Sequence, residues 1–271
     1  MTLSISKFIH LLSLLFPRAI LRCHGWTSTT ESPYLTALSA YQPPNDPKQT
    51  LKEPDNQYGR MAFWDESYRQ ALEQPDDHSH AKVFSWYCDW NDLKPFFKEI
   101  VPEKESRIMI PGVGNDGCLR DMFDDGYRQL TAFDYAPEGV ECAKRIMDYR
   151  LQYMDDLRVA DARNLPYKNS DFDAVFDKGT LDSIYLSGGS DKDLSQKHLN
   201  MTVSELARVL KSGGIVFSIN AACTNAIQKA FDESNMTCDI WEQLRDGNTY
   251  MTDDGYTSNN VDATILVWKK V

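Results

Sequence analysis

The chain has 271 residues, a hydrophobic fraction of 42% and a formal net charge of −11. This length suits one large α/β domain, alone or with an appendage. The acidity argues against nucleic acid as the main partner, because nucleic-acid binders usually present a basic face, whereas a basic protein substrate would fit. The six cysteines are scattered and have no partners at zinc-ligand spacing, so we expect reduced, mostly buried thiols and no metal site.

Residues 1–30 have the features of a targeting leader. They contain a short apolar stretch and basic residues, and no acid precedes Glu31. Such a segment suits an organelle or the secretory pathway, and it is too short and interrupted for stable membrane insertion. The alternative is an amphipathic helix docked on the domain. Residues 31–56 are rich in proline and polar residues and are interpreted as a linker, which places the domain at residues 57–271.

An aromatic segment opens this domain. Trp64 and Tyr68 are four positions apart and therefore share one helical face, and Trp86 follows across a polar loop. Taken alone, aromatic residues at helical spacing are more often core than ligand contacts. The next helix is expected to be capped by Asn91 or Asp92 and to bury a stripe of apolar residues. That stripe consists of Leu93, Phe96, Phe97, Ile100 and Val101.

A glycine-rich turn follows the first predicted strand, which covers residues 108–110. Gly112, Gly114 and Gly117 make the turn, and apolar residues at helical spacing come next. Glycine allows backbone to pass close to a ligand, and a helix start presents unpaired N–H groups, so this arrangement suits an anionic or nucleoside ligand. Taken alone the motif is weak, because glycines also serve simply to make turns.

Three predicted strands in succession end in an acid. The strand at residues 130–134 ends in Asp134, which lies 22 positions after Gly112, the spacing at which a carboxylate can accept hydrogen bonds from ribose hydroxyls. The alternative for Asp134 is a helix cap, since Pro137 suits a first helical turn. The next two strands end in Asp161 and Asp177. Because parallel strands point the same way, all three carboxylates are expected along one sheet edge, which indicates a ligand crevice.

The remaining chain is predicted to alternate between helices and strands. A helix containing Val203 and Leu206 is expected to end at Gly213 and Gly214, before a strand at residues 215–219. A further helix and a pair of strands near residues 238–245 and 261–269 complete the domain. A polar insertion at residues 246–260 lies between these two strands.

In this order, the glycine turn, the three acids and the segment Arg208 to Gly214 resemble class I S-adenosylmethionine-dependent methyltransferases over residues 57–271. More specifically, the chain is similar to the branch that contains the lysine methyltransferases of elongation factor 1A. The segments that narrow the resemblance are Phe63 to Tyr68, Phe84 to Trp86, Gly112 to Asn115, Asp134-Tyr135 and Asp177 to Asp182. The resemblance implies an α/β, Rossmann-like, seven-stranded sheet with helices on both faces, and S-adenosyl-L-methionine as the cofactor.

The resemblance also implies a role for each site residue. Gly112 and Gly114 would approach the amino-acid part of the cofactor, Asp134 would bind the ribose, and Tyr135 would flank the adenine. The remaining contacts would be made by Asp161 and Ala162 at the adenine edge, by Lys178 beside the methionine end, and by Trp64, Tyr68 and Trp86 as an aromatic cover. Two residues depart from the family pattern, Pro111 and Asp116, which replace aliphatic and small residues. Gly117 sits one place late for the usual pattern and is assigned to helix entry.

The most favoured function is methylation of a protein lysine, on a substrate of the elongation factor 1A type. Asp177 is the candidate to accept the lysine proton or to position the amine. A small-molecule methyltransferase and a noncatalytic S-adenosylmethionine-binding module are the alternatives, because one scaffold serves many acceptors. Family resemblance places the protein in the cytoplasm, whereas a leader at residues 1–30 would send it to an organelle or the secretory pathway.

Overall fold

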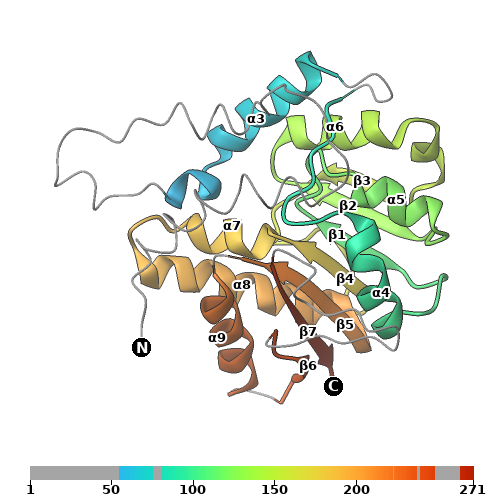
Figure 1. Ribbon diagram of the computed structural model, residues 1–271. Coiled ribbons are helices and arrows are strands. Elements are labelled where there is room, and N and C mark those ends of the chain that lie inside the picture. Colours follow the sequence, from blue (N-terminus) through green and yellow to red (C-terminus); the bar gives the residue numbers. More distant parts are fainter. Residues whose placement is uncertain (1–54, 76–80, 222, 237–238, 248–262) are drawn as a thin grey trace, which may run out of the picture.

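The computed structural model describes residues 55–75, 81–221, 223–236, 239–247 and 263–271. The expected leader, most of the linker and most of the 246–260 insertion lie outside these residues. Seven strands form one sheet in the order β3-β2-β1-β4-β5-β7-β6 (Figure 1). The strands are β1 (Ile108–Pro111), β2 (Leu130–Asp134), β3 (Asp156–Val159), β4 (Phe172–Lys178), β5 (Leu210–Asn220), β6 (Trp241–Arg245) and β7 (Thr264–Lys270).

Helices cover both faces of this sheet, as predicted. In chain order they are η1 (Asp55–Gly59), α3 (Met61–Glu73), α4 (Trp90–Ile100), α5 (Cys118–Asp124), α6 (Pro137–Met147), η2 (Asp148–Tyr153), α7 (Thr180–Leu186), α8 (Lys192–Val209) and α9 (Thr224–Asn235). Helices α4, α5 and α6 bury apolar side chains against one face, and α7, α8 and α9 against the other. Helix α3 packs on α6, outside these two layers (Figure 1). No helix among the described residues is long and apolar enough to cross a bilayer.

The strand order contains a switch point between β1 and β4. Strands β3, β2, β1, β4 and β5 are parallel, whereas β7 runs antiparallel to both β5 and β6. The chain order reverses between β1 and β4, since β2 and β3 lie on one side of β1 and β4 and β5 on the other. Loops leave such a switch point in opposite directions, and ligands of α/β proteins bind in the opening between them.

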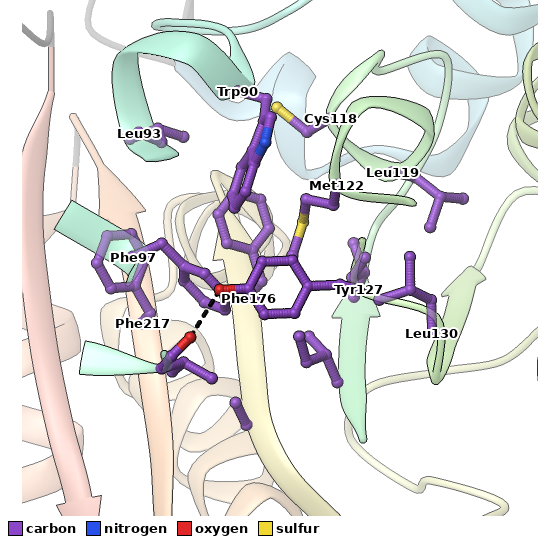
Figure 2. Packing of buried hydrophobic residues seen from close by; sticks show 14 of the residues in the cluster. Trp90, Leu93, Phe97, Cys118, Leu119, Met122, Tyr127, Leu130, Phe176 and Phe217 are labelled. Atoms are coloured by element: carbon purple, nitrogen blue, oxygen red, sulfur yellow. Dashed lines mark hydrogen bonds between the residues drawn. The ribbon is translucent and has the colours of Figure 1, made fainter. Parts of the chain in front are cut away.

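An aromatic cluster forms the core under α4 (Figure 2). Trp90, Phe97, Tyr127, Phe176 and Phe217 are each at most 2% exposed. Their rings meet mostly edge to face, with Phe97 centroids 5.3 to 5.6 Å from those of its four neighbours. The Tyr127 hydroxyl donates to the Val101 carbonyl at 2.6 Å, the dashed line in Figure 2, so this buried hydroxyl is satisfied. The Trp90 indole Nε1 in the same cluster has no hydrogen-bond partner among the described residues. This packing anchors α4 to β4 and β5.

The predicted cap of α4 is wrong. Neither Asn91 nor Asp92 is the N-cap, because Asp89 occupies that position and α4 begins at Trp90. The Asp89 carboxylate accepts from the backbone N–H groups of Asn91 and Asp92, while the Asp92 carboxylate accepts from the Asp89 N–H. This reciprocal capping box starts the helix two or three residues earlier than expected, because Trp90 itself belongs to the buried stripe.

Two further boundaries differ from the sequence prediction. Helix α8 ends at Val209, and Gly213 and Gly214 do not cap it but lie within β5, where the register against β4 shifts. Gly213 has φ 80°, the left-handed conformation that both a helix end and a bulge demand of glycine, so sequence could not separate the two. Strand β3 ends at Val159, so Asp161 lies two residues beyond the strand rather than at its tip.

Candidate functional site

The glycine turn after β1 requires glycine at two positions for both conformation and space. Gly112 has φ 60° and Gly114 has φ 46°. A Cβ atom at position 112 would lie 2.2 Å from Thr180 Oγ1, and one at position 114 would lie 2.5 Å from the Tyr68 hydroxyl. Gly117 has φ −77° and is the N-cap of α5, which confirms its assignment to helix entry.

Asp134 ends β2 directly beside this turn. Its side chain is 1% exposed, and Oδ2 accepts from the Gly114 N–H at 3.0 Å and from the Tyr68 hydroxyl at 3.4 Å. Oδ1 accepts from the Ala136 N–H at 2.9 Å, at the start of α6. Burial raises the pKa of Asp134 to about 6, although these hydrogen bonds oppose the increase. The acid therefore reaches the glycine turn and supports the entry to α6, but it is not the N-cap of that helix, because Ala136 occupies that position. Its role as ribose acceptor stays a prediction.

The aromatic cover, Trp64, Tyr68 and Trp86, lies over the turn and the acid. Trp64 and Tyr68 share one face of α3, are at most 8% exposed, and stack with centroids 5.7 Å apart. Trp86 is half-buried and meets Trp64 edge to face at 5.9 Å. The Trp64 indole donates to the Tyr58 carbonyl at 2.7 Å, which ties α3 to η1. The structure thus brings these three side chains together beside Gly114 and Asp134.

Lys178 is a buried junction between three segments. Its side chain is 6% exposed, and its ammonium donates to the Trp86 carbonyl at 3.0 Å and to the Cys88 carbonyl at 2.8 Å. The third partner is the carboxylate of Asp116 in the glycine turn. Burial alone would lower the pKa of Lys178, but the Asp116 carboxylate raises it above the ordinary value. The departure from the family pattern at Asp116 therefore supplies the counter-ion of Lys178.

Asp161 and Ala162 follow β3 on the same edge of the sheet. The Ala160 N–H donates to the Asp134 carbonyl at 3.0 Å, which places this loop beside the end of β2, next to Tyr135. The Asp161 carboxylate is held by the Arg163 guanidinium; burial would raise its pKa, but these bonds lower it below the ordinary range. Ala162 is 7% exposed and packs into the core under α8.

Asp177 is as deeply buried as Asp134, whereas Asp161 is only partly buried. The Asp177 carboxylate accepts from the Thr180 and Leu181 N–H groups at 3.1 and 3.3 Å and from the Ser218 hydroxyl at the end of β5. Burial raises the pKa of Asp177 to about 7. Its contacts hold the start of α7 and join β4 to β5, so Asp134, Asp161 and Asp177 lie along one sheet edge but contact different groups.

Two further polar residues lie near this edge: Asp182, which the sequence also offers as a proton acceptor beside Asp177, and Tyr87, which the sequence does not single out. Asp182 is 3% exposed and accepts from the Tyr87 hydroxyl at 3.0 Å. Asp182 belongs to the segment from Asp177 to Asp182 that narrowed the resemblance, which was the available signal. No such sequence signal marks Tyr87, since no periodicity distinguishes it from its neighbours. A separate groove of about 730 Å³ between α8 and α9 contains none of the predicted site residues.

Comparison with known proteins agrees with this geometry. Residues 110–218, from β1 to β5, match a family described as a methyltransferase domain. The chain is 28% identical over 178 residues to EEF1A lysine methyltransferase 4 of Mus musculus, and the match covers 64% of this chain and 65% of that protein. It is 25% identical over 180 residues to the eEF1A lysine and N-terminal methyltransferase of Homo sapiens, covering 66% of this chain but 24% of that protein. The chain therefore spans less than two thirds of these relatives.

Solved structures support the fold. A structure described as the conversion of a disulfide bond into a thioacetal group during echinomycin biosynthesis aligns with a TM-score of 0.51 and 14% identity. The alignment covers 78% of this chain and 92% of that one. At this identity the likeness concerns the arrangement of the sheet and helices.

Proposed function

We propose that the chain is a class I S-adenosylmethionine-dependent methyltransferase that transfers methyl groups to a lysine side chain of a protein, of the elongation factor 1A type. The observation that carries the proposal is the junction of Asp134, Gly114 and the aromatic cover. A buried carboxylate joined to left-handed glycine backbone under stacked rings suits a nucleoside that carries a charged amino-acid group.

The residues at this edge fit S-adenosylmethionine. Gly112 and Gly114 would approach its amino-acid part, Asp134 would accept from the ribose hydroxyls, and Tyr135, Asp161 and Ala162 would surround the adenine. Trp64, Tyr68 and Trp86 would cover it. Lys178 would act beside the methionine end by holding Trp86 and Asp116 in place, because its ammonium donates to both segments. When bound, the cofactor would supply an electrophilic methyl group on a sulfonium, and attack by an unprotonated amine on that methyl carbon would break the carbon–sulfur bond and release S-adenosylhomocysteine as the leaving group.

The protein's contribution to this displacement is mainly positioning, which can supply about 7 to 11 kcal/mol. The lysine must first lose a proton, which from an unperturbed pKa near 10.4 costs roughly 4.6 kcal/mol at pH 7. We propose that Asp177 accepts this proton or positions the amine, and a pKa of about 7 is matched to proton transfer near neutral pH. Asp177→Asn is then expected to lower turnover at saturating cofactor while cofactor affinity holds; unchanged turnover would exclude this role.

The experiment that tests the function is incubation with methyl-labelled S-adenosylmethionine and a cell extract, followed by purified elongation factor 1A. We expect label in a protein band, and on a lysine after digestion. Label in a small metabolite would instead assign the small-molecule alternative, and cofactor binding without transfer would assign a noncatalytic module. Asp134→Ala is the matched control, since it should weaken cofactor affinity by about tenfold or more.

The partner and compartment follow from the same resemblance. A protein with a net charge of −11 suits a basic protein substrate better than nucleic acid. We propose a cytoplasmic location, to be tested by imaging the full chain and a variant that lacks residues 1–30. Relocation of the full chain to an organelle, reversed by the deletion, would overturn it.

A further inference from the structure

Tyr87 has a backbone conformation that aromatic residues rarely adopt. Its φ is 66°, and among the described residues only Asp148 and Ser170 share a positive φ without being glycine. Such a conformation persists only where its surroundings impose it, and it is concentrated at functional sites. Tyr87 directly follows Trp86 of the aromatic cover.

Two sets of contacts impose this conformation. The ammonium of Lys178 binds the carbonyls of Trp86 and Cys88, the residues on either side of Tyr87. The Tyr87 hydroxyl donates to Asp182 Oδ2 at 3.0 Å. Asp182 is itself fixed, because it accepts from the N–H groups of Ala221 at 2.9 Å and Cys223 at 2.7 Å. The backbone and the hydroxyl of Tyr87 are therefore both held by buried charged groups.

The ring of Tyr87 lies at the carboxyl edge of β4. A Cβ atom at Gly179 would come within 3.2 Å of this ring, so glycine at 179 allows the ring to approach the backbone. The next residue, Thr180, donates through Oγ1 to the Pro111 carbonyl at 2.9 Å, which ties this loop to the glycine turn. The ring thus stands near the turn expected to meet the amino-acid end of the cofactor, on the opposite side of β1 from Asp161 and the adenine end.

We propose that the Tyr87 ring, oriented by Asp182, forms a wall of the site that receives the acceptor lysine. This inference rests on the proposed function and names a residue for its substrate side. An aromatic face attracts an alkylammonium group and desolvates the attached methylene chain, and the Asp182 carboxylate behind the ring adds negative charge. The Lys178 contacts hold the peptide units on both sides of the ring, so the wall is rigid before the substrate arrives.

The test separates binding of acceptor from binding of cofactor. For Tyr87→Leu, which removes the ring, we expect KM for purified elongation factor 1A to rise by about tenfold, within the range of cation–π contacts, while the cofactor Kd from calorimetry changes less than twofold. Tyr87→Phe keeps the ring but loses the hydrogen bond to Asp182, so its KM for elongation factor 1A should lie between that of the unaltered protein and that of Tyr87→Leu. Tyr153→Leu is the matched control, since Tyr153 is 60% exposed and precedes β3 at the opposite sheet edge.

Three results would overturn the inference. If Tyr87→Leu leaves both constants unchanged, the ring is not part of the acceptor site. If it weakens cofactor binding as much as acceptor binding, or if neither Tyr87 variant folds by circular dichroism, Tyr87 only clamps the segment that carries Trp86. Absence of transfer to any protein by the unaltered chain would instead overturn the proposed function, and this inference with it.

Discussion

Two groups of aromatic side chains in this protein are similarly buried but have different neighbours. Trp90, Phe97 and Tyr127 belong to the core under α4, where rings and aliphatic side chains surround one another. Trp64 and Tyr68 are at most 8% exposed, yet Tyr68 lies against the backbone of Gly114 and the carboxylate of Asp134, and Trp64 stacks on the Tyr68 ring. Burial alone therefore does not separate core from ligand site. The polarity of the surface beneath the rings separates the two, because burying a carboxylate costs free energy unless hydrogen bonds compensate for the lost water.

The largest expected effect is on the core side of this comparison. Phe97→Ala should lower the free energy of unfolding by about 3 to 5 kcal/mol, because the fully buried ring leaves a cavity among four other rings. Urea unfolding measures this change. Trp86→Ala, in the half-buried part of the cover, should cost less stability but weaken cofactor binding. If Trp86→Ala destabilised the fold more and left cofactor affinity intact, the two groups would not differ in role.

The second effect concerns the acid beneath the cover. With a pKa raised to about 6 by burial, Asp134 is ionised above that pH and loses a hydrogen-bond acceptor below it. Cofactor affinity should therefore fall towards tenfold per pH unit below about pH 6, which is about 1.4 kcal/mol per unit. Calorimetry between pH 5 and 8 measures it, with Asp134→Asn as the control that binds weakly at every pH. A flat profile in the unaltered protein would exclude Asp134 as the ribose acceptor.

The third effect concerns the ion pairs of Asp125, beside the core under α4. The Asp125 carboxylate pairs with Lys94, Lys98 and Lys104, and these bonds outweigh burial and lower its pKa to about 2. Its stabilising contribution is present above the unfolded pKa of about 4 and is lost as pH falls towards 2. Asp125→Asn should cost about 1 to 2 kcal/mol at pH 7, a value kept small because the lysines are about one third exposed, and this cost should vanish only below about pH 2. Cofactor affinity should not change.

The smallest effect concerns the Tyr68 hydroxyl in the aromatic cover. The Tyr68 hydroxyl contacts Asp134 Oδ2 at 3.4 Å, a long hydrogen bond to the oxygen that also faces the glycine turn. Tyr68→Phe keeps the stack on Trp64 but removes a competitor for that oxygen, so cofactor should bind up to about threefold more tightly. Calorimetry at pH 7.5 checks the sign. A large loss of affinity would mean that the hydroxyl binds the ligand directly.

Most of the sheet could be predicted because its strands are short apolar runs bounded by turn residues. The strands at residues 108–110 and 130–134 and the paired strands at the C-terminus were all anticipated. The misplaced boundaries share one cause: the same local sequence feature is compatible with two different structures. Asp89 and Asp92 both suit a cap, and the left-handed glycine at Gly213 suits either a helix end or a bulge.

The sequence by itself determined the order of the elements, the glycines of the turn and the set of acids at the strand ends. These follow from local periodicity and spacing, which depend on neighbouring residues alone. Only the tertiary structure decided what each polar side chain contacts, because those partners are far apart in the chain. Lys178 meets the carbonyls on either side of Tyr87 across about ninety residues, and Tyr68 reaches Asp134 across 66. Such contacts arise at the carboxyl ends of β2 and β4, on either side of β1, and packing rather than spacing fixes these positions.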